Sequence, residues 1–281
     1  MHGRTVVITG ATSGIGAVAA RRLAERGARI VFIARDRERA DQALHALRAV
    51  QPGAAHAAFL ADLSRLADMR RVGEEIAAAE PRIDVLLNNA GMITFEPQRT
   101  EDGLERMFAT NHLAYFVLTG LLLKPLQAAG AARIVSTASE AHRGRTFDIS
   151  RLQEGAGMRG YGVTKLCNIL FTRELARRLA GTGVTANCLH PGFVATRFGD
   201  DAHGLARAAL RVAKRLFATS EERGAETLLY LASAPEVAGR TGEYFIRCAP
   251  AAPSREAQNE ANARALWEHS QALAGAVFDR P

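Results

Sequence analysis

The sequence predicts an α/β fold in which a doubly wound parallel sheet is flanked by helices. Short apolar, β-branched runs alternate with helical stretches along most of the chain, and a glycine-rich segment follows the first run. Crossover helices between successive strands make those strands parallel and cover both faces of the sheet. Because such crossovers are right-handed, the sheet becomes doubly wound.

The elements are predicted in order along the chain. Thr5–Thr9 is the first strand, and a helical pattern runs from about Ile15 to Arg26. Arg29–Ala34 is the second apolar run, followed by a charged helical stretch to Ala49. Further strands are predicted, with helical stretches between them, at Ala55–Leu60, Ile83–Asn88, Arg133–Thr137 and Val184–His190. No Pro/Gly/Ser-rich linker divides residues 1–281, so we expect a single domain.

The amino-acid composition of the chain excludes several classes of protein. Hydrophobic residues make up 48% of the chain and charged residues 23%, which suits a buried core and argues against disorder. The net charge is +7, but the arginines are scattered without an aromatic-interleaved stripe, so we expect no nucleic-acid partner. No apolar run reaches membrane-spanning length, and the first strand begins near the N-terminus. We therefore expect a cytoplasmic protein without a transmembrane segment.

The three cysteines give no sign of a disulfide framework or a metal site. Cys167, Cys188 and Cys248 are an odd number, far apart, without a Cys-x-x-Cys pair or a histidine-rich partner. Such a pattern indicates a reducing compartment and no bound metal.

The segment Thr9–Gly16 predicts a phosphate-binding loop. Gly10 allows a tight turn, Gly14 lets the backbone approach a pyrophosphate, and Gly16 lets helix and strand pack closely. The following helix supplies amide donors and a positive dipole end for the phosphate. Because the glycines stand between a predicted strand and a predicted helix, cofactor binding is favoured over a simple turn.

Tyr161 and Lys165 are a candidate catalytic pair. They are four residues apart in a stretch predicted to be helical through about Ala180, so they lie on one helical face. A free tyrosine has a pKa of about 10. A neighbouring ammonium group favours the phenolate and makes proton transfer accessible. Together with the phosphate loop, the pair indicates an oxidoreductase.

The glycine spacing Gly-x-x-x-Gly-x-Gly and several further motifs resemble the short-chain dehydrogenase/reductase family, most closely its retinol-dehydrogenase-like branch. The matching motifs are Asp62-Leu63, Asn88-Asn89-Ala90-Gly91, Asn111-His112-Leu113, the Tyr161/Lys165 helix, His190-Pro191-Gly192, Gly242-Glu243-Tyr244-Phe245 and the stretch around Trp267. The resemblance covers nearly the whole chain and implies one Rossmann-type domain.

The resemblance implies a set of cofactor-binding residues. Asp62 would bind the adenine edge, or alternatively cap the next helix, and Leu63 would donate a backbone amide. Asn89 would brace the sheet and line the cofactor channel, and Thr196 would lie near the carboxamide or the diphosphate. The full set is Gly10, Thr12, Ser13, Gly14, Ile15, Gly16, Arg35, Asp62, Leu63, Asn89, Ala90, Gly91, Tyr161, Lys165, Pro191, Gly192, Val194 and Thr196.

The end of the second strand favours NADPH over NADH. An acidic residue there would bind the adenosine ribose hydroxyls and repel a 2′-phosphate. By the family spacing from Gly10, this position is Ala34, followed by Arg35. Arginine pairs with phosphate through two parallel hydrogen bonds, which predicts NADP as the cofactor. Alternatively, Arg35 only opens a charged helix, and Asp36 beside it weakens the positive charge.

The family's catalytic set corresponds to Asn111, Ser139, Tyr161 and Lys165. Tyr161 would protonate a carbonyl oxygen as hydride arrives, and would act as the base in reverse. Lys165 would lower the pKa of Tyr161 and bind the nicotinamide ribose, and Ser139 would donate a hydrogen bond to the substrate oxygen. Asn111 would hold a water that connects Lys165 to solvent. Ala138 replaces the first of two serines usual in the family, and Ser139 matches the second.

The substrate pocket is expected between Glu140–Gly160 and Phe193–Phe217. The second segment has an apolar stripe with basic residues elsewhere, which predicts a lid over about residues 193–220 and a lipophilic aldehyde or ketone. The same pattern also fits a helix resting on anionic lipid, although a fold of this kind needs a lid there. The resemblance implies a dimer or tetramer formed through the long central helices. A helical tail over about residues 254–275 would pack on the body or on a partner.

The preferred function is an NADP(H)-dependent oxidoreductase that interconverts a carbonyl and an alcohol. A non-catalytic NADP(H)-binding sensor is an alternative, but such sensors usually lose the tyrosine or the lysine. Reduction of a ring double bond, as in protochlorophyllide reductases, is a further alternative, because those enzymes resemble this branch.

Overall fold

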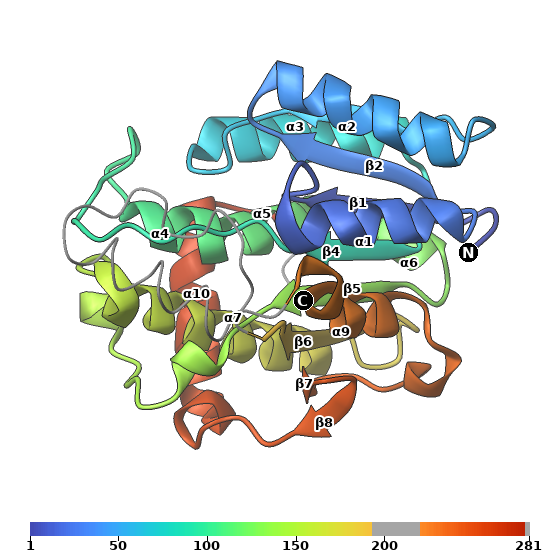
Figure 1. Ribbon diagram of the computed structural model, residues 1–281. Coiled ribbons are helices and arrows are strands. Elements are labelled where there is room, and N and C mark those ends of the chain that lie inside the picture. Colours follow the sequence, from blue (N-terminus) through green and yellow to red (C-terminus); the bar gives the residue numbers. More distant parts are fainter. Residues whose placement is uncertain (193–219, 279–281) are drawn as a thin grey trace.

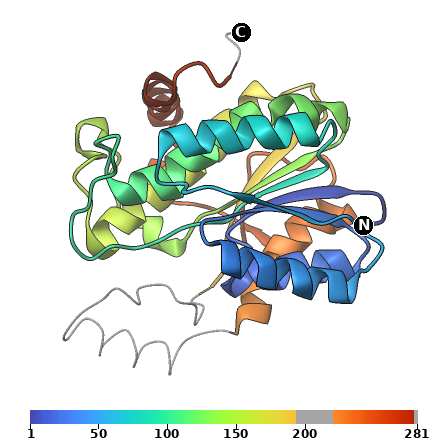
Figure 2. The same ribbon diagram turned by 90° about the horizontal axis from the view of Figure 1, so that it is seen from above.

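A computed structural model describes residues 1–192 and 220–278, which form one sheet with helices on both faces (Figures 1 and 2). The strand order is β3-β2-β1-β4-β5-β6-β7-β8. The strands are β1 (Thr5–Thr9), β2 (Arg29–Ala34), β3 (Ala57–Leu60), β4 (Val85–Asn88), β5 (Arg133–Thr137), β6 (Thr185–His190), β7 (Tyr244–Ile246) and β8 (Ala249–Ala251). This arrangement confirms the predicted doubly wound α/β class.

The strand order reverses between β1 and β4, where Val6 pairs in parallel with Val85. On its other side β1 pairs with β2, with Thr5 opposite Arg29. Connections that leave β1 and β4 therefore run in opposite directions along the sheet. A crevice opens at the carboxyl ends of these two strands, which is the usual ligand position in such a sheet.

Helices cover the sheet in two layers (Figure 2). One core layer contains α1, α2 and α9, and the other contains α3, α5, α7 and α10. The described helices are α1 (Gly14–Glu25), α2 (Arg37–Val50), α3 (Leu66–Ala79), α4 (Arg106–Phe108), α5 (Ala114–Leu121), α6 (Leu123–Ala128), α7 (Gly157–Arg178), α9 (Glu221–Ser233) and α10 (Glu260–Ala274). A short π-helix, Ala109–Leu113, joins α4 to α5. No helix within these described ranges is long and apolar enough to cross a membrane.

The six predicted strands are confirmed, although three of them start one or two residues later than predicted. The expectation of a wholly parallel sheet is wrong at one edge, where β8 runs antiparallel to β7. Only Arg247 and Cys248 separate these strands, and both have positive φ angles of 51° and 61°. A turn of two residues cannot make a parallel crossover, so the edge is a hairpin.

Helix α10 is the predicted helical tail, and it packs on the body of its own chain, across α5 and α7. Its Trp267 ring lies 5.0 Å from the ring of Phe116 on α5 and 6.0 Å from that of Phe171 on α7. The Arg178 guanidinium lies 4.3 Å from the Trp267 ring centre. Figure 1 shows α10 running behind α7. The predicted oligomer through the central helices stays a prediction, and α10 covers part of that face.

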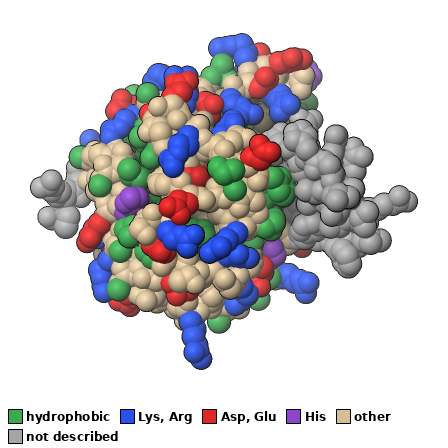
Figure 3. Space-filling view, turned by 90° about the vertical axis from the view of Figure 1, so that its left-hand side faces the viewer, with side chains coloured by type: hydrophobic (Ala, Val, Ile, Leu, Met, Phe, Trp, Pro, Cys, Tyr) green, Lys and Arg blue, Asp and Glu red, His purple; other side chains and the backbone are tan. Residues whose placement is uncertain are grey.

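One face of the molecule carries a mixture of charges. In Figure 3, blue basic and red acidic side chains alternate over the described surface, without a broad area of one sign. Many of the arginines are paired with nearby acids on the same helix, as Arg71 is with Glu75 at 3.0 Å. The positive net charge is therefore spread in small, partly neutralised groups.

Replacing Trp267 with alanine should lower the free energy of unfolding by about 3–5 kcal/mol, because it empties an aromatic cluster that joins three helices. Denaturant unfolding followed by circular dichroism measures the change. Val50→Ala, an exposed site on α2, is the control and should cost under about 0.5 kcal/mol. Equal costs for the two variants would show that α10 is not anchored through Trp267.

Candidate active site

Asn89, at the end of β4, holds the glycine-rich loop after β1 in place. Its side-chain amide donates to the carbonyl oxygens of Thr9 at 3.1 Å and Gly10 at 3.3 Å. In the opposite direction, the backbone amides of Asn89 and Ala90 donate to Thr9 Oγ1 at 2.9 Å. The side chain of Asn89 therefore braces the two strands across the switch point, as expected for this turn.

The loop itself has the geometry of a phosphate cradle. Gly10 and Gly14 have φ angles of 73° and 59°, a region that favours glycine. Helix α1 begins at Gly14 without an acidic residue in its first turn, and the Ser13 side chain does not cap it. The amides at this helix end therefore keep their positive potential for an anion. Thr12 is half-buried and Ile15 is buried beside the loop. These features fit a dinucleotide pyrophosphate.

Asp62 and Leu63 follow β3 at the same edge of the sheet. Asp62 Oδ1 accepts hydrogen bonds from the amide and hydroxyl of Ser64, at 2.9 and 2.8 Å. The alternative that Asp62 caps α3 is wrong, because the first helical amide, that of Leu66, donates to Asp102 instead. The expected contact of Asp62 with an adenine edge stays a prediction.

Arg35 is exposed at the end of β2, directly after Ala34. Within residues 1–192 and 220–278, its guanidinium has no ion-pair partner. The neighbouring Asp36 carboxylate caps α2 by accepting from the Arg39 amide at 2.9 Å. The alternative that Arg35 opens the helix is wrong, because α2 begins at Arg37.

The predicted catalytic side chains meet at the carboxyl end of β5. Lys165 Nζ donates to the carbonyl oxygen of Thr137 at 2.8 Å and lies 5.5 Å from the centre of the Tyr161 ring. Ser139, two residues after β5 ends, hydrogen-bonds the Tyr161 phenol. Ser139 Oγ also accepts from the amide of Ala141 at 3.2 Å. The single hydroxyl proton of Ser139 can therefore be donated to one partner at a time, either the phenol or a substrate oxygen.

Burial dominates the ionisation of the pair. It raises the pKa of Tyr161 above its usual value, and the hydrogen bond from Ser139 opposes this change. Burial also lowers the pKa of Lys165 to about 7. The expectation that Lys165 lowers the pKa of the phenol stays a prediction, since the changes in the pKa of Tyr161 come from burial and from Ser139. Tyr161 is protonated at neutral pH, which suits a general acid.

Asn111 lies in the π-helix rather than in a regular helix. Its buried side chain accepts from the amide of Met92 at 2.7 Å and donates to the Met92 carbonyl at 2.8 Å. The second amide proton goes to Thr164 Oγ1 at 3.1 Å. Both side-chain protons are thus used to hold the loop after β4 against α7. A Cβ added at Gly91 would lie 3.4 Å from Asn111 Oδ1 and 3.5 Å from Lys165 Nζ, which places all three together.

Pro191 and Gly192 follow β6, and Gly192 has a φ of 87°. They lie at the same carboxyl edge of the sheet as the catalytic residues. Val194 and Thr196 lie outside the described residues, as does almost all of the predicted lid.

Comparison with known proteins agrees with this geometry. Residues 4–203 match the family model described as short chain dehydrogenase. The chain belongs to the short-chain dehydrogenase family.

Within this family it falls in the retinol-dehydrogenase-like branch. It is 40% identical to human retinol dehydrogenase 14, over 98% of this chain and 87% of the relative, and 38% identical to human retinol dehydrogenase 13, over 97% and 85%. A crystal structure of a Mycobacterium paratuberculosis protein is similar with a TM-score of 0.78 and 32% identity, over 99% of this chain and 96% of that one. A Burkholderia cenocepacia short chain dehydrogenase in complex with NADP has a TM-score of 0.68 and 28% identity, over 87% and 96%.

Two residues of this short-chain dehydrogenase site were not predicted. The hydroxyl of Tyr115 donates to the Ala90 carbonyl at 2.8 Å, and Lys165 Nζ lies 5.9 Å from its ring centre. Asn168 donates to the carbonyl of Thr137, the acceptor of Lys165, at 3.1 Å. Their spacing was a usable signal, because Tyr115 follows Asn111 by four residues and Asn168 follows Lys165 by three, which keeps each on the functional face.

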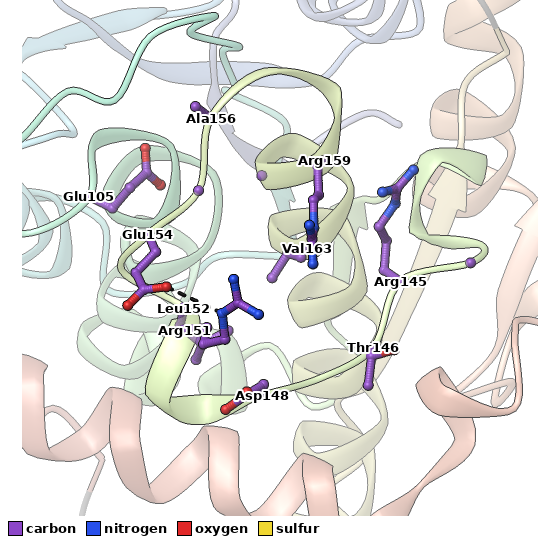
Figure 4. Close-up of a pocket in the computed structure, with 13 residues that line it drawn as sticks. Glu105, Arg145, Thr146, Asp148, Arg151, Leu152, Glu154, Ala156, Arg159 and Val163 are labelled. Carbon is purple, nitrogen blue, oxygen red and sulfur yellow. Dashed lines mark hydrogen bonds and ion pairs between the residues drawn. The ribbon is translucent and has the colours of Figure 1, made fainter.

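The segment expected to wall the substrate pocket lines a hollow of about 570 Å³ (Figure 4). Val163 and Arg159, both lining residues, lie about 200° around α7 from Tyr161. The hollow therefore opens on the side of the helix away from the catalytic residues. Its charged lining residues are Glu105, Arg145, Asp148, Arg151, Glu154 and Arg159. The other expected wall, Phe193–Phe217, lies outside the described residues.

Gly16→Ala should abolish NADPH binding and lower stability by about 1–3 kcal/mol, because the new methyl group overpacks the loop. A Cβ there would lie 2.1 Å from the Gly10 carbonyl oxygen and 2.5 Å from Asn89 Nδ2. Isothermal calorimetry with NADPH and thermal unfolding measure the two effects. The control is Gly53→Ala, where nothing lies within 4 Å. Unchanged NADPH affinity in Gly16→Ala would contradict the assignment of this loop.

Proposed function

We propose that this short-chain dehydrogenase interconverts a carbonyl and an alcohol with NADP(H), using Tyr161 as general acid and base. One observation supports the proposal above all. The Tyr161 phenol is hydrogen-bonded by Ser139 and lies beside a buried lysine, at the same sheet edge as the phosphate loop. A proton donor, a hydrogen-bond donor and a glycine-rich loop thus lie at one edge of the sheet, which supports the proposal.

The nicotinamide cofactor supplies or accepts the hydride at the substrate carbon. In reduction, Tyr161 transfers its proton to the carbonyl oxygen, which becomes the alcohol hydroxyl, and the phenol is left as phenolate. Ser139 donates a hydrogen bond to that oxygen, where negative charge develops. In alcohol oxidation the phenolate removes the hydroxyl proton. Lys165 Nζ lies 5.5 Å from the centre of the Tyr161 ring, and its ammonium form favours the phenolate.

Lys165 can be either a charged ammonium or a neutral amine near neutral pH, because burial lowers its pKa to about 7. It can therefore pass a proton toward the phenolate without leaving a permanent buried charge. For the predicted relay, Asn111 would hold a water through an atom other than its side-chain protons, which bind Met92 and Thr164. In the family, this lysine also binds the nicotinamide ribose.

NADP is the proposed cofactor because of Arg35. Its exposed guanidinium lies one residue beyond the end of β2, and Asp36 is committed to α2. The Burkholderia cenocepacia relative was solved in complex with NADP. The remaining proposed contacts are the loop residues Thr12, Ser13 and Ile15, with Asp62, Leu63, Ala90, Gly91, Pro191, Gly192, Val194 and Thr196.

A lipophilic aldehyde or ketone is the proposed substrate. Met158 is 50% exposed and precedes Tyr161 by three residues on α7, so it shares the catalytic face of the helix. An exposed large apolar side chain beside the acid suits an apolar substrate. The names of the retinol dehydrogenase relatives are consistent with this class.

Tyr161→Phe should keep NADPH affinity within about two-fold and reduce kcat by at least about 100-fold, the size of one lost general acid. NADPH oxidation is followed with a panel of medium-chain and aromatic aldehydes and ketones. Tyr230→Phe, on α9, is the control and should retain wild-type kcat. Undiminished turnover in Tyr161→Phe would overturn the mechanism. Tight NADPH binding by the wild type with no turnover on any carbonyl would favour a nucleotide sensor.

Arg35→Ala should weaken NADPH binding about 30-fold, equivalent to about 2 kcal/mol for a charged hydrogen bond, and leave NADH nearly unchanged. Calorimetry with each cofactor gives both affinities. The control is Arg48→Ala, which also removes one positive charge, from an exposed site in the last turn of α2. It should change the affinities for NADPH and NADH equally and only slightly. An equal loss for NADPH and NADH in Arg35→Ala would remove the argument for NADP.

A further inference from the structure

A line of buried polar side chains connects α10 to the catalytic lysine. Of these side chains, only Lys165 takes part in the reaction described above. At the outer end, Ser270 of α10 is completely buried, three residues after Trp267. Its hydroxyl lies 2.9 Å from Nε2 of His112. His112 is also completely buried and follows Asn111 in the π-helix. The C-terminal helix therefore touches the π-helix through a polar contact inside the core.

His112 is confined by aromatic rings as well. Its ring centre lies 5.2 Å from that of Phe108 and 6.0 Å from that of Phe171, the latter edge-on. Burial lowers the pKa of His112 to about 3, while the neighbouring Asn168 side chain raises it and the charge of His269 lowers it. The imidazole is therefore neutral at physiological pH and carries one proton, on one of its two nitrogens.

Two buried atoms at the middle of this line have no hydrogen-bond partner by geometry among the described residues. They are Nδ1 of His112 and Oδ1 of Asn168. One can donate and the other can only accept, and leaving each unpaired in the core costs about 1–3 kcal/mol. His112 packs edge-on against Phe171 at 6.0 Å, and Phe171 follows Asn168 by three residues on α7, so His112 and Asn168 lie on facing sides of the two helices.

At the inner end, Asn168 reaches the catalytic lysine through a shared acceptor. Asn168 Nδ2 donates to the carbonyl oxygen of Thr137 at 3.1 Å, and Lys165 Nζ donates to the same oxygen at 2.8 Å. Asn168 follows Lys165 by three residues on α7, so one helical face presents both donors to the end of β5. Asn168 and the catalytic lysine therefore share one backbone acceptor.

We propose that Ser270, His112 and Asn168 form a continuous buried hydrogen-bond chain that positions Lys165 for the proposed reaction. In this chain the Ser270 hydroxyl donates to His112 Nε2, His112 Nδ1–H donates to Asn168 Oδ1, and Asn168 Nδ2–H donates to the Thr137 carbonyl. Every group then donates and accepts in one consistent direction, which fixes the histidine tautomer and the amide orientation. The three residues are positioning residues, since none of them touches the reacting atoms.

This hydrogen-bond chain makes α10 a part of the active site. Trp267 anchors α10 on Phe116 and Phe171, and Ser270 lies on the next turn of the same helix. The titratable groups that face the chain are His269 of α10 on its outer side, and Tyr115 of α5 and Tyr161 of α7 around Lys165. A substitution in this hydrogen-bond chain should therefore change the ionisation of Lys165 and Tyr161.

The tautomer of His112 is the first test, and it is independent of any catalytic activity. Imidazole ¹⁵N chemical shifts in the full-length protein, assigned by comparison with His112→Asn, should show a neutral ring protonated on Nδ1 that does not titrate between about pH 5 and 9. A ring protonated on Nε2, or one that titrates in this range, would overturn the chain. This result stands even if no carbonyl substrate is turned over.

Kinetics with Ser270→Ala and Asn168→Ala provide the second test. Each variant should lower kcat roughly ten-fold or more by displacing Lys165, and should shift the pH profile of kcat, while NADPH affinity changes less. In the double variant the effects should be non-additive, because breaking one link already breaks the chain. Ser233→Ala, a helix serine on α9 that donates to Leu229, is the control and should leave kcat and its pH profile unchanged.

Other outcomes would overturn the proposal. Variants that lose thermal stability but keep the wild-type kcat and pH profile would show a purely structural role for these residues. Strictly additive losses would show that Ser270 and Asn168 act separately. If Asn168→Ala does not fold, Ser270→Ala alone carries the kinetic test, because removing one hydroxyl at the outer end leaves the core volume nearly intact.

Discussion

The carbonyl oxygen of Thr137 is the acceptor on which the active site depends. It lies at the end of β5 and holds the buried ammonium of Lys165 at 2.8 Å. Taking an ammonium group out of water is expensive, and burial accordingly lowers the pKa of Lys165 to about 7. The lysine is tolerated because it is held by one strong acceptor next to a phenol. That placement makes it useful, since a lysine near its own pKa can exchange a proton at neutral pH.

The cofactor side of the site also depends on a few close contacts with backbone groups. Asn89 ties the loop after β1 to the end of β4, and Gly16 packs so closely on Gly10 that no side chain fits between them. The loop is therefore rigid where a pyrophosphate would bind, and the end of α1 is free of acidic side chains. A preformed cradle of this kind binds an anion without having to reorganise when the ligand arrives.

The sequence predicted the fold class and the positions of six strands along the chain, because β-branched runs and glycine positions are local signals. The edge hairpin was missed, since β7 and β8 have only three residues each and one contains Pro250. Asn168 and Tyr115 were missed because their roles come from contacts with Thr137 and Ala90, which are distant in sequence. The effect of burial on the pKa of Tyr161 could not be predicted either, because spacing along a helix says nothing about desolvation.

The most direct test of this account is the ionisation of Tyr161 itself. The ultraviolet difference spectrum of phenolate, taken as wild type minus Tyr161→Phe, is titrated with and without NADP. The account predicts a pKa above the ordinary tyrosine value of about 10 for the protein alone, and a lower value when the positively charged cofactor is bound. A phenol that already ionises well below 10 in the protein alone would contradict it, because the lysine rather than burial would then control the proton.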